Sequence, residues 1–216
     1  MEFMRGLPAM RQIVLTAIAS VLIGTAVFLI QKKQPSADPF ASGLEAYAAG
    51  NYAKAYAFFE KSGRPEALFS LGAMNFAGKG VPQNSAKALA FYKRAADLNY
   101  APALTTLGIL LAGENNIDEA LAFLEKAADL NDGEALILLA KWYENGTHVE
   151  QNTVKAVEYY EKAAKAGVLD AETALYIIYS KGKKGVYPNP NRALRHRLKV
   201  EKQNELLKKL RPSEKK

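Results

Sequence analysis

The chain has 216 residues, of which 49% are hydrophobic and 24% are charged, as is ordinary for a globular protein. It contains no cysteine, so disulfide bonds, cysteine-ligated zinc and a thiol nucleophile are all excluded. The net charge of +7 is uneven: residues 1–33 carry +3, residues 34–180 carry −6 and residues 181–216 carry +10. These values indicate an acidic body with a strongly basic C-terminal end.

The first predicted element is a membrane-spanning helix over residues 13–30, after an N-terminal tail of residues 1–12. These eighteen residues contain no charge and no proline. At a rise of about 1.5 Å per residue they span about 27 Å, close to the roughly 30 Å hydrocarbon core of a bilayer. A cleaved signal peptide is the alternative, but its apolar core is usually about 7–15 residues long and is followed by a cleavage site, which is lacking here.

The orientation of this span is left open by its flanking charges. Arg5 and Arg11 precede it, and Lys32 and Lys33 follow it. The positive-inside rule is therefore almost balanced. Because a short tail ahead of a large domain usually stays in the cytoplasm, we expect a single-pass protein of the inner (cell) membrane. Its folded domain would then lie in the periplasm of a bacterium.

Small side chains recur every four residues along the predicted span, at Thr16, Ser20 and Gly24. They share one helix face, where a second membrane helix could approach closely. A chance arrangement in a span rich in small residues is the alternative. Residues 31–39 contain two prolines and no large apolar side chain, so we expect a polar linker there.

Residues 40–191 are predicted to be a series of helical repeats, because four segments of this region align with one another. Equivalent leucines mark them, at spacings of 36, 32 and 36 residues: Leu71, Leu107, Leu139 and Leu175. A shortened unit precedes them, so about five helix pairs are expected. No single pair could bury its apolar face alone, and the units must therefore stack.

Each unit has small residues at two positions, one where helices would meet and one where the first helix would end. Gly72, Gly108 and Ala140 follow the marker leucines and allow close approach of a neighbouring helix. A glycine is then expected to end the first helix of each pair, because glycine tolerates positive φ. These glycines are Gly78, Gly113, Gly146 and Gly182.

These motifs resemble the Sel-one-like repeat family, which is related to the tetratricopeptide repeats. The best matching unit contains Leu71-Gly72, Gly78-x-Gly80-Val81, Lys87-Ala88 and Tyr92. The resemblance implies an all-α fold, an α-solenoid of about five antiparallel helix pairs, and a module for protein–protein interaction. Arg197 replaces an expected aromatic residue in the last unit, which suits a terminal cap facing water.

The resemblance also implies that the first helix of each pair lines a concave groove. Eleven positions counted from the marker leucines are expected to face it: Phe69, Ala73, Phe76, Thr105, Ile109, Ala112, Ile137, Lys141, Glu144, Thr173 and Ile177. Several are apolar and would be unusually exposed in an empty groove. We expect the groove to hold a helix or extended segment of a partner protein. The alternative is that neighbouring repeats cover these side chains.

Little in the sequence supports catalysis. His148 is expected in a surface loop, and His196 has no acidic residue one helical turn away, so we expect both on the surface. No cofactor or metal site is predicted, and the glycine pairs near Lys79 and Lys183 lack the strand-to-helix setting of a phosphate loop.

Residues 192–216 are predicted to form a basic capping helix and tail, in which five leucines between Leu194 and Leu210 would make one apolar stripe. Attachment to anionic lipid or to an acidic partner is the second interpretation of this basic helix. Nucleic acid is not expected.

Two functions remain for such a chain. The first is a membrane-anchored scaffold or adaptor that binds its protein partner through the solenoid. The second is an inhibitor, such as an immunity protein that neutralises a toxin in the periplasm. The sequence does not name the partner in either case.

Overall fold

The structure is a computed structural model that describes residues 38–210. The predicted membrane helix, its small-residue face at Thr16, Ser20 and Gly24, and nearly all of the linker lie outside the described residues. Among residues 38–210, no helix combines the length and the apolar character that a membrane crossing requires.

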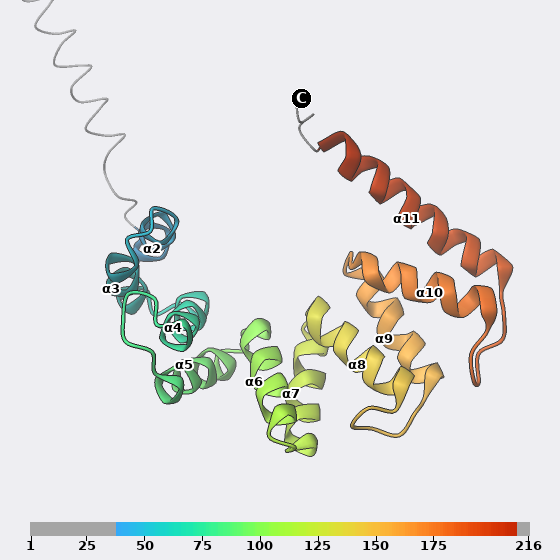
Figure 1. The fold of residues 1–216 in the computed structure, drawn as a ribbon, viewed down its shortest axis with the longest axis horizontal. Helices are drawn as coiled ribbons and strands as arrows, with labels where there is room; N and C mark the ends of the chain where they lie inside the picture. The colour runs from blue at the N-terminus through green and yellow to red at the C-terminus, as the bar shows by residue number, and fades with distance from the viewer. Residues whose placement is uncertain (1–37, 211–216) are drawn as a thin grey trace, which may run out of the picture.

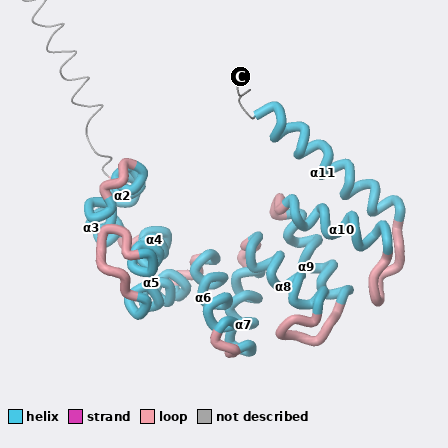
Figure 2. Tube along the Cα trace, in the orientation of Figure 1, coloured by secondary structure: helices cyan, strands magenta, loops and turns pink. Residues whose placement is uncertain are grey.

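The described part of the chain is all-α, with ten helices in sequence order. They are α2 (Pro39–Ala48), α3 (Tyr52–Ser62), α4 (Pro65–Ala77), α5 (Ser85–Asp97), α6 (Ala101–Gly113), α7 (Ile117–Asp129), α8 (Gly133–Asn145), α9 (Thr153–Lys165), α10 (Leu169–Lys181) and α11 (Pro190–Leu210). Consecutive helices form five pairs, from α2 with α3 to α10 with α11. The pairs follow one another along an open arc (Figure 1), and short loops join them (Figure 2). The predicted α-solenoid of about five helix pairs is confirmed.

The core runs along the arc as a row of small and large side chains. Alanine pairs near the ends of α5, α7 and α9 allow close contact with the following helix, and the marker leucines fill the space between the two helices of a pair. These pairs are Ala95-Ala96, Ala127-Ala128 and Ala163-Ala164. Gly108 shows why bulk is excluded there. A Cβ atom on it would lie 2.6 Å from Leu124 Cγ and 3.1 Å from the carbonyl oxygen of Ala120.

One predicted helix end is wrong. Gly113 is the last residue of α6, and the residue with positive φ after the helix is Asn115, at 62°. Asparagine takes the same left-handed position after α5 and α7, at Asn99 and Asn131. Asparagine tolerates this conformation better than other residues with a Cβ atom, so a search for glycine alone misses these ends.

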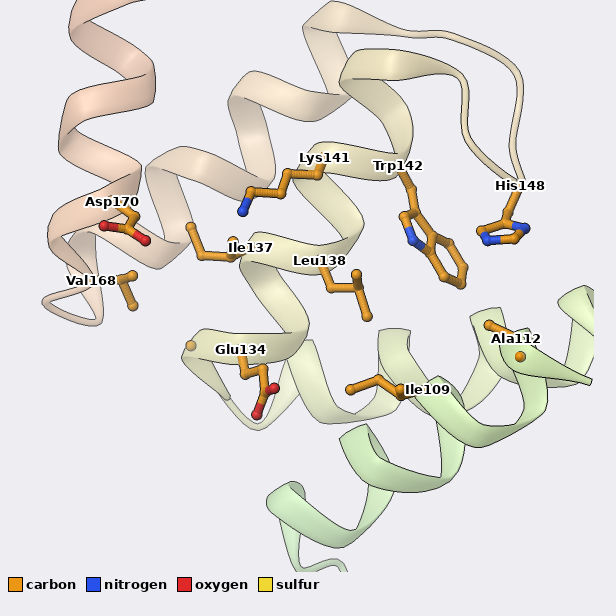
Figure 3. Close-up of a pocket in the computed structure, with 12 residues that line it drawn as sticks. Ile109, Ala112, Glu134, Ile137, Leu138, Lys141, Trp142, His148, Val168 and Asp170 are labelled. Atoms are coloured by element: carbon orange, nitrogen blue, oxygen red, sulfur yellow. The ribbon is translucent and has the colours of Figure 1, made fainter.

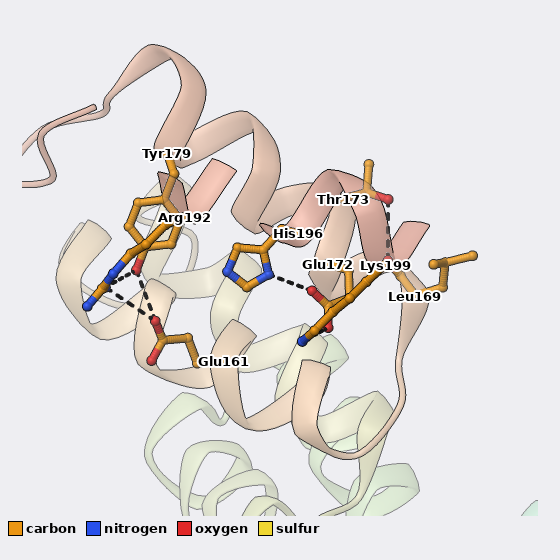
Figure 4. Close-up of polar contacts among 8 residues, drawn as sticks. All are labelled: Glu161, Leu169, Glu172, Thr173, Tyr179, Arg192, His196 and Lys199. Carbon is orange, nitrogen blue, oxygen red and sulfur yellow. Dashed lines mark hydrogen bonds and ion pairs between the residues drawn. The ribbon is translucent and has the colours of Figure 1, made fainter. Parts of the chain in front are cut away.

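The expectation that His196 lies on the surface is also wrong. His196 is buried, its Nδ1 lies 2.5 Å from Glu172 Oε2, and its ring stacks on that of Tyr179 (Figure 4). Glu172 belongs to α10 and lies 24 residues earlier, so no search along one helix could find it. Glu172 also accepts a hydrogen bond from Lys199 Nζ at 2.7 Å.

The leucines of α11 do not form the face that packs on the array. Ala193 and His196 are buried against α10, whereas Leu194, Leu198, Leu206 and Leu207 are exposed. Arg197 is exposed and pairs with Glu201 at 2.7 Å. These charged residues occupy the places of Tyr160 and Ala164 in α9, so α11 ends the array with a polar surface.

Candidate partner-binding groove

A groove of about 850 Å³ lies between the first helices of the third, fourth and fifth pairs. We call it the α8 groove, because α8 contributes half of its lining residues (Figure 3). Its lining consists of Ile109, Ala112, Gly113, Gly133, Glu134, Ile137, Leu138, Lys141, Trp142, His148, Val168 and Asp170. Most of these residues are apolar or glycine, and three of them, Glu134, Lys141 and Asp170, are charged.

The position of α8 depends on a polar contact with the preceding pair. Asp132 is the N-cap of α8, and its Oδ1 accepts hydrogen bonds from the backbone N–H of Ala135 at 2.9 Å and from the hydroxyl of Thr105 at 2.8 Å. One carboxylate oxygen therefore caps α8 and joins it to α6. Because capping satisfies a helix N–H that would otherwise lack a partner, this contact stabilises both walls of the α8 groove.

Trp142 and His148 form the end of the groove that faces the loop after α8. Their ring centroids are 4.7 Å apart. Gly146 ends α8 in a left-handed conformation, and His148 also has a positive φ, so the loop turns sharply back toward α8. Trp142 is the only tryptophan of the chain, and most of its side chain is buried.

The charged residues of the groove are Glu134, Lys141 and Asp170. All three are exposed, and Figure 3 shows Lys141 and Asp170 extending toward the same end. Two carboxylates and one ammonium surround a largely apolar surface. This arrangement suits a partner segment with apolar anchors and at least one cationic group.

Four of the eleven predicted residues line the α8 groove: Ile109, Ala112, Ile137 and Lys141. Four others are exposed but lie outside it: Ala73, Phe76, Thr173 and Ile177. Phe76 instead borders a smaller cavity between α5 and α6. The structure thus brings together the middle of the predicted set, around α6 and α8.

The remaining three side chains have contacts within the array. Phe69 packs on the rings of Tyr92 and Tyr100, with centroid distances of 5.3 and 5.5 Å. Thr105 is buried and donates its hydrogen bond to Asp132. For these two positions, neighbouring residues cover the side chain.

Glu144 is the third of these residues. Its carboxylate accepts hydrogen bonds from Lys183 Nζ at 2.7 Å and from the Tyr160 hydroxyl at 2.6 Å. Burial alone would raise its pKa, but the bonds from Lys183 and Tyr160 outweigh burial and hold the pKa of Glu144 below its usual range. Glu144 therefore joins α8, α9 and the loop before α11.

Sequence reasoning missed Trp142, His148, Glu134 and Asp170 as groove residues. Trp142 falls at a repeat position and is buried as a core residue would be, so its spacing alone does not mark it for the groove. A signal for the two acids did exist: the second residue of α4, α8 and α10 is acidic in each case, as Glu66, Glu134 and Asp170. That recurrence places carboxylates at the same end of successive first helices.

Several solved structures are similar to this chain. A crystal structure of a Sel1 repeat protein from Oxalobacter formigenes is similar, with a TM-score of 0.66, 29% identity, and coverage of 74% of this chain and 68% of that chain. A protective antigen of uropathogenic Escherichia coli has a TM-score of 0.48 and 23% identity, covering 81% of this chain and 47% of that chain. An immunity protein from Pseudomonas aeruginosa has a TM-score of 0.46 and 19% identity, covering 80% and 85%.

The last two similarities are too weak to support a conclusion about function. No curated protein matches the chain. The Sel1 repeat family matches five successive segments, residues 43–64, 65–100, 107–132, 133–168 and 172–196, which together make up more than half of the sequence. The chain therefore belongs to the Sel1 repeat family, whose solenoid is a protein-interaction fold.

Proposed function

We propose that the protein is a membrane-anchored adaptor that holds a segment of a partner protein in the α8 groove and has no catalytic role. The observation that carries this proposal is the groove itself. It is an apolar depression of about 850 Å³ between first helices of the solenoid, bordered by Glu134, Lys141 and Asp170. A concave apolar surface with a few charges is the usual form of a binding site for a peptide or helix.

Exposure of apolar side chains supports the same proposal. Ile109 is 42% exposed and Ile177 is 49% exposed, on the first helices of their pairs. A Sel1 array can cover such positions, as it does at Phe69, so their exposure is not required by the fold. An apolar surface left open along successive repeats favours a partner that covers it.

The anchor is proposed from the apolar residues 13–30, and the periplasm from the order of a short tail and a large domain. With this anchor, the groove would hold its partner close to the membrane. Accessibility of single cysteines to a membrane-impermeant reagent, in intact and in opened cells, tests the location. Modification of Ala90→Cys only in opened cells would contradict the periplasmic placement.

Site-specific photo-crosslinking tests the groove. A photoreactive amino acid is placed at Ile109 in the full chain, and a matched control is placed at Leu89 of α5, which is 37% exposed outside the groove. We expect a discrete protein adduct from position 109 and none from position 89. The same adduct from both positions, or none from either in the native membrane, would contradict the groove assignment.

Identification of the adduct separates the two functions. A component of an envelope complex supports the adaptor. A secreted toxin supports the alternative, an inhibitor such as an immunity protein that neutralises a toxin in the periplasm. Loss of toxin protection by Ile109→Glu, but not by Leu89→Glu, would support the alternative directly.

A further inference from the structure

An exposed side of α11 carries a row of cations. Arg195, Lys202 and Lys209 recur every seven residues, so they lie along one line of the helix. Leu198 and Leu206 lie beside this line and are 55% and 57% exposed. We call these five residues the basic strip of α11.

The cations of the strip are not used within the array. Arg192 pairs with Glu161, Arg197 with Glu201 and Lys199 with Glu172. Within residues 38–210, no ion pair involves a cation of the basic strip. Their charge is therefore available to a ligand outside the chain.

The opposite side of α11 docks on α10 and leaves the strip exposed. Ala193 and His196 are buried against α10, and Glu172 bonds both His196 and Lys199 (Figure 4). After Lys199, no hydrogen bond to another helix is described for α11. The second half of the helix thus stands clear of the array, as Figure 1 shows.

A second groove lies along this free half. It has a volume of about 610 Å³ and lies between α11 and the turn that joins α9 to α10. Lys202, Leu206 and Lys209 of the basic strip line it. Two acids also line it: Glu172, whose charge is opposed by Lys199, and Glu205, which leaves Lys202 and Lys209 in excess. The groove therefore offers cations beside an apolar side chain to an anionic ligand.

We infer that the basic strip binds the anionic surface of a lipid bilayer. The charge is complementary, since α11 carries seven Lys and Arg against two acids. The exposed leucines between the cations match the boundary between headgroups and acyl chains, where basic amphipathic helices lie. An acidic protein surface would satisfy the cations but leave this pattern of separate leucines unexplained.

The arrangement of the chain ends agrees with this inference. The start of α2 and the end of α11 both lie toward the open side of the arc in Figure 1. The predicted membrane helix, residues 13–30, precedes α2 by a short linker. Contact of α11 with the same bilayer would attach the solenoid at both ends and set the direction in which the α8 groove opens.

The absence of cysteine allows a direct test in the full chain. Gln203→Cys, on the free half of α11, is labelled with an environment-sensitive fluorophore, and Ala90→Cys on α5 serves as the control position. The protein is reconstituted in vesicles of phosphatidylcholine alone, or of phosphatidylcholine with phosphatidylglycerol in both leaflets, so that orientation does not matter. We expect a blue shift at position 203 only in the anionic vesicles, and a smaller one at high salt.

Charge neutralisation tests which residues are responsible. Arg195→Gln, Lys202→Gln and Lys209→Gln together should reduce the ratio of bound to free α11 by roughly 100-fold, since each cation near an anionic surface contributes about 1 kcal/mol and about 1.4 kcal/mol corresponds to a factor of ten. The matched control neutralises three exposed lysines of the body, Lys61, Lys87 and Lys93. That variant should keep the full blue shift.

Three results would overturn the inference. One is an equal emission shift in neutral and anionic vesicles. Another is an equal loss of the shift in the two triple variants. The third is the same shift in neutral vesicles after addition of inorganic phosphate, an acidic protein or an oligonucleotide. Flotation with neutral vesicles reports the N-terminal anchor and crosslinking at Ile109 reports the groove, so failure of either proposed element is distinguished from failure of the basic strip.

Discussion

The packing of α6 on α7 can be tested with two glycines of the same helix. Gly108 is buried, and a Cβ atom there would lie 2.6 Å from Leu124 Cγ, well inside the roughly 3.5–4.0 Å of an ordinary carbon contact. Leu124 is 0% exposed and cannot move into solvent. Gly113 has no atom within 4 Å of its added Cβ. Replacement by alanine should therefore have opposite effects at the two positions.

The magnitude follows from two opposing contributions. Overpacking of a core costs typically about 1–3 kcal/mol, and the backbone oxygen of Ala120 at 3.1 Å favours the upper end. Alanine gains about 1 kcal/mol over glycine inside a helix. We expect Gly108→Ala to lower the free energy of unfolding by about 2 kcal/mol. Gly113→Ala, at the helix end, should raise it by up to about 0.5 kcal/mol.

Urea unfolding followed by circular dichroism at the helical minimum measures both variants against the parent chain. A lower midpoint for Gly108→Ala and an equal or higher midpoint for Gly113→Ala are expected, with closely similar slopes. If Gly108→Ala is as stable as Gly113→Ala, the α6–α7 contact is looser than described. The close-packing explanation of the repeat glycines would then be wrong.

Three further predictions concern polar contacts and the groove. Glu172→Gln should weaken the docking of α11 by about 1–3 kcal/mol, seen as faster amide hydrogen exchange in α11 but not in α6; unchanged exchange would contradict its role. The lowered pKa of Glu144 means that its stabilisation is present above the unfolded pKa and is lost as pH falls through the folded value. Glu144→Gln should therefore reduce the free energy of unfolding by about 1–2 kcal/mol at pH 7 and by much less in acid. An equal loss of stability at pH 7 and in acid would refute the role of the Glu144 carboxylate. Occupation of the α8 groove should change the emission of Trp142, the only tryptophan, and Ile109→Glu should abolish that change. A response that survives Ile109→Glu would place the partner elsewhere.

The α8 groove was only partly predictable. Ile109 and Ile137 were expected to face it because both positions were counted from the marker leucines. Thr105 was counted in the same way, yet its hydroxyl turns to Asp132, 27 residues later. Spacing along a helix gives the direction of a side chain but not which side chain of the next repeat reaches it.

His196 illustrates the same limit. Its own helix contains no acidic residue at the right spacing, so local reasoning placed it in solvent. The burial of His196 against Glu172 follows from the antiparallel packing of α11 on α10. The exposed position of Leu198 and Leu206 follows from the same packing, because the face that contains Ala193 turns inward.

The sequence alone determined the repeat, its five units and the helical class, because close packing of helices requires small residues at regular spacing, and such spacing is local. Tertiary structure alone decided where the array leaves apolar surface open, at the α8 groove, and where it leaves cations unpaired, on α11. Both depend on contacts between residues about 20 to 40 positions apart, such as Lys183 with Glu144. The pattern within one helix carries no information about such contacts.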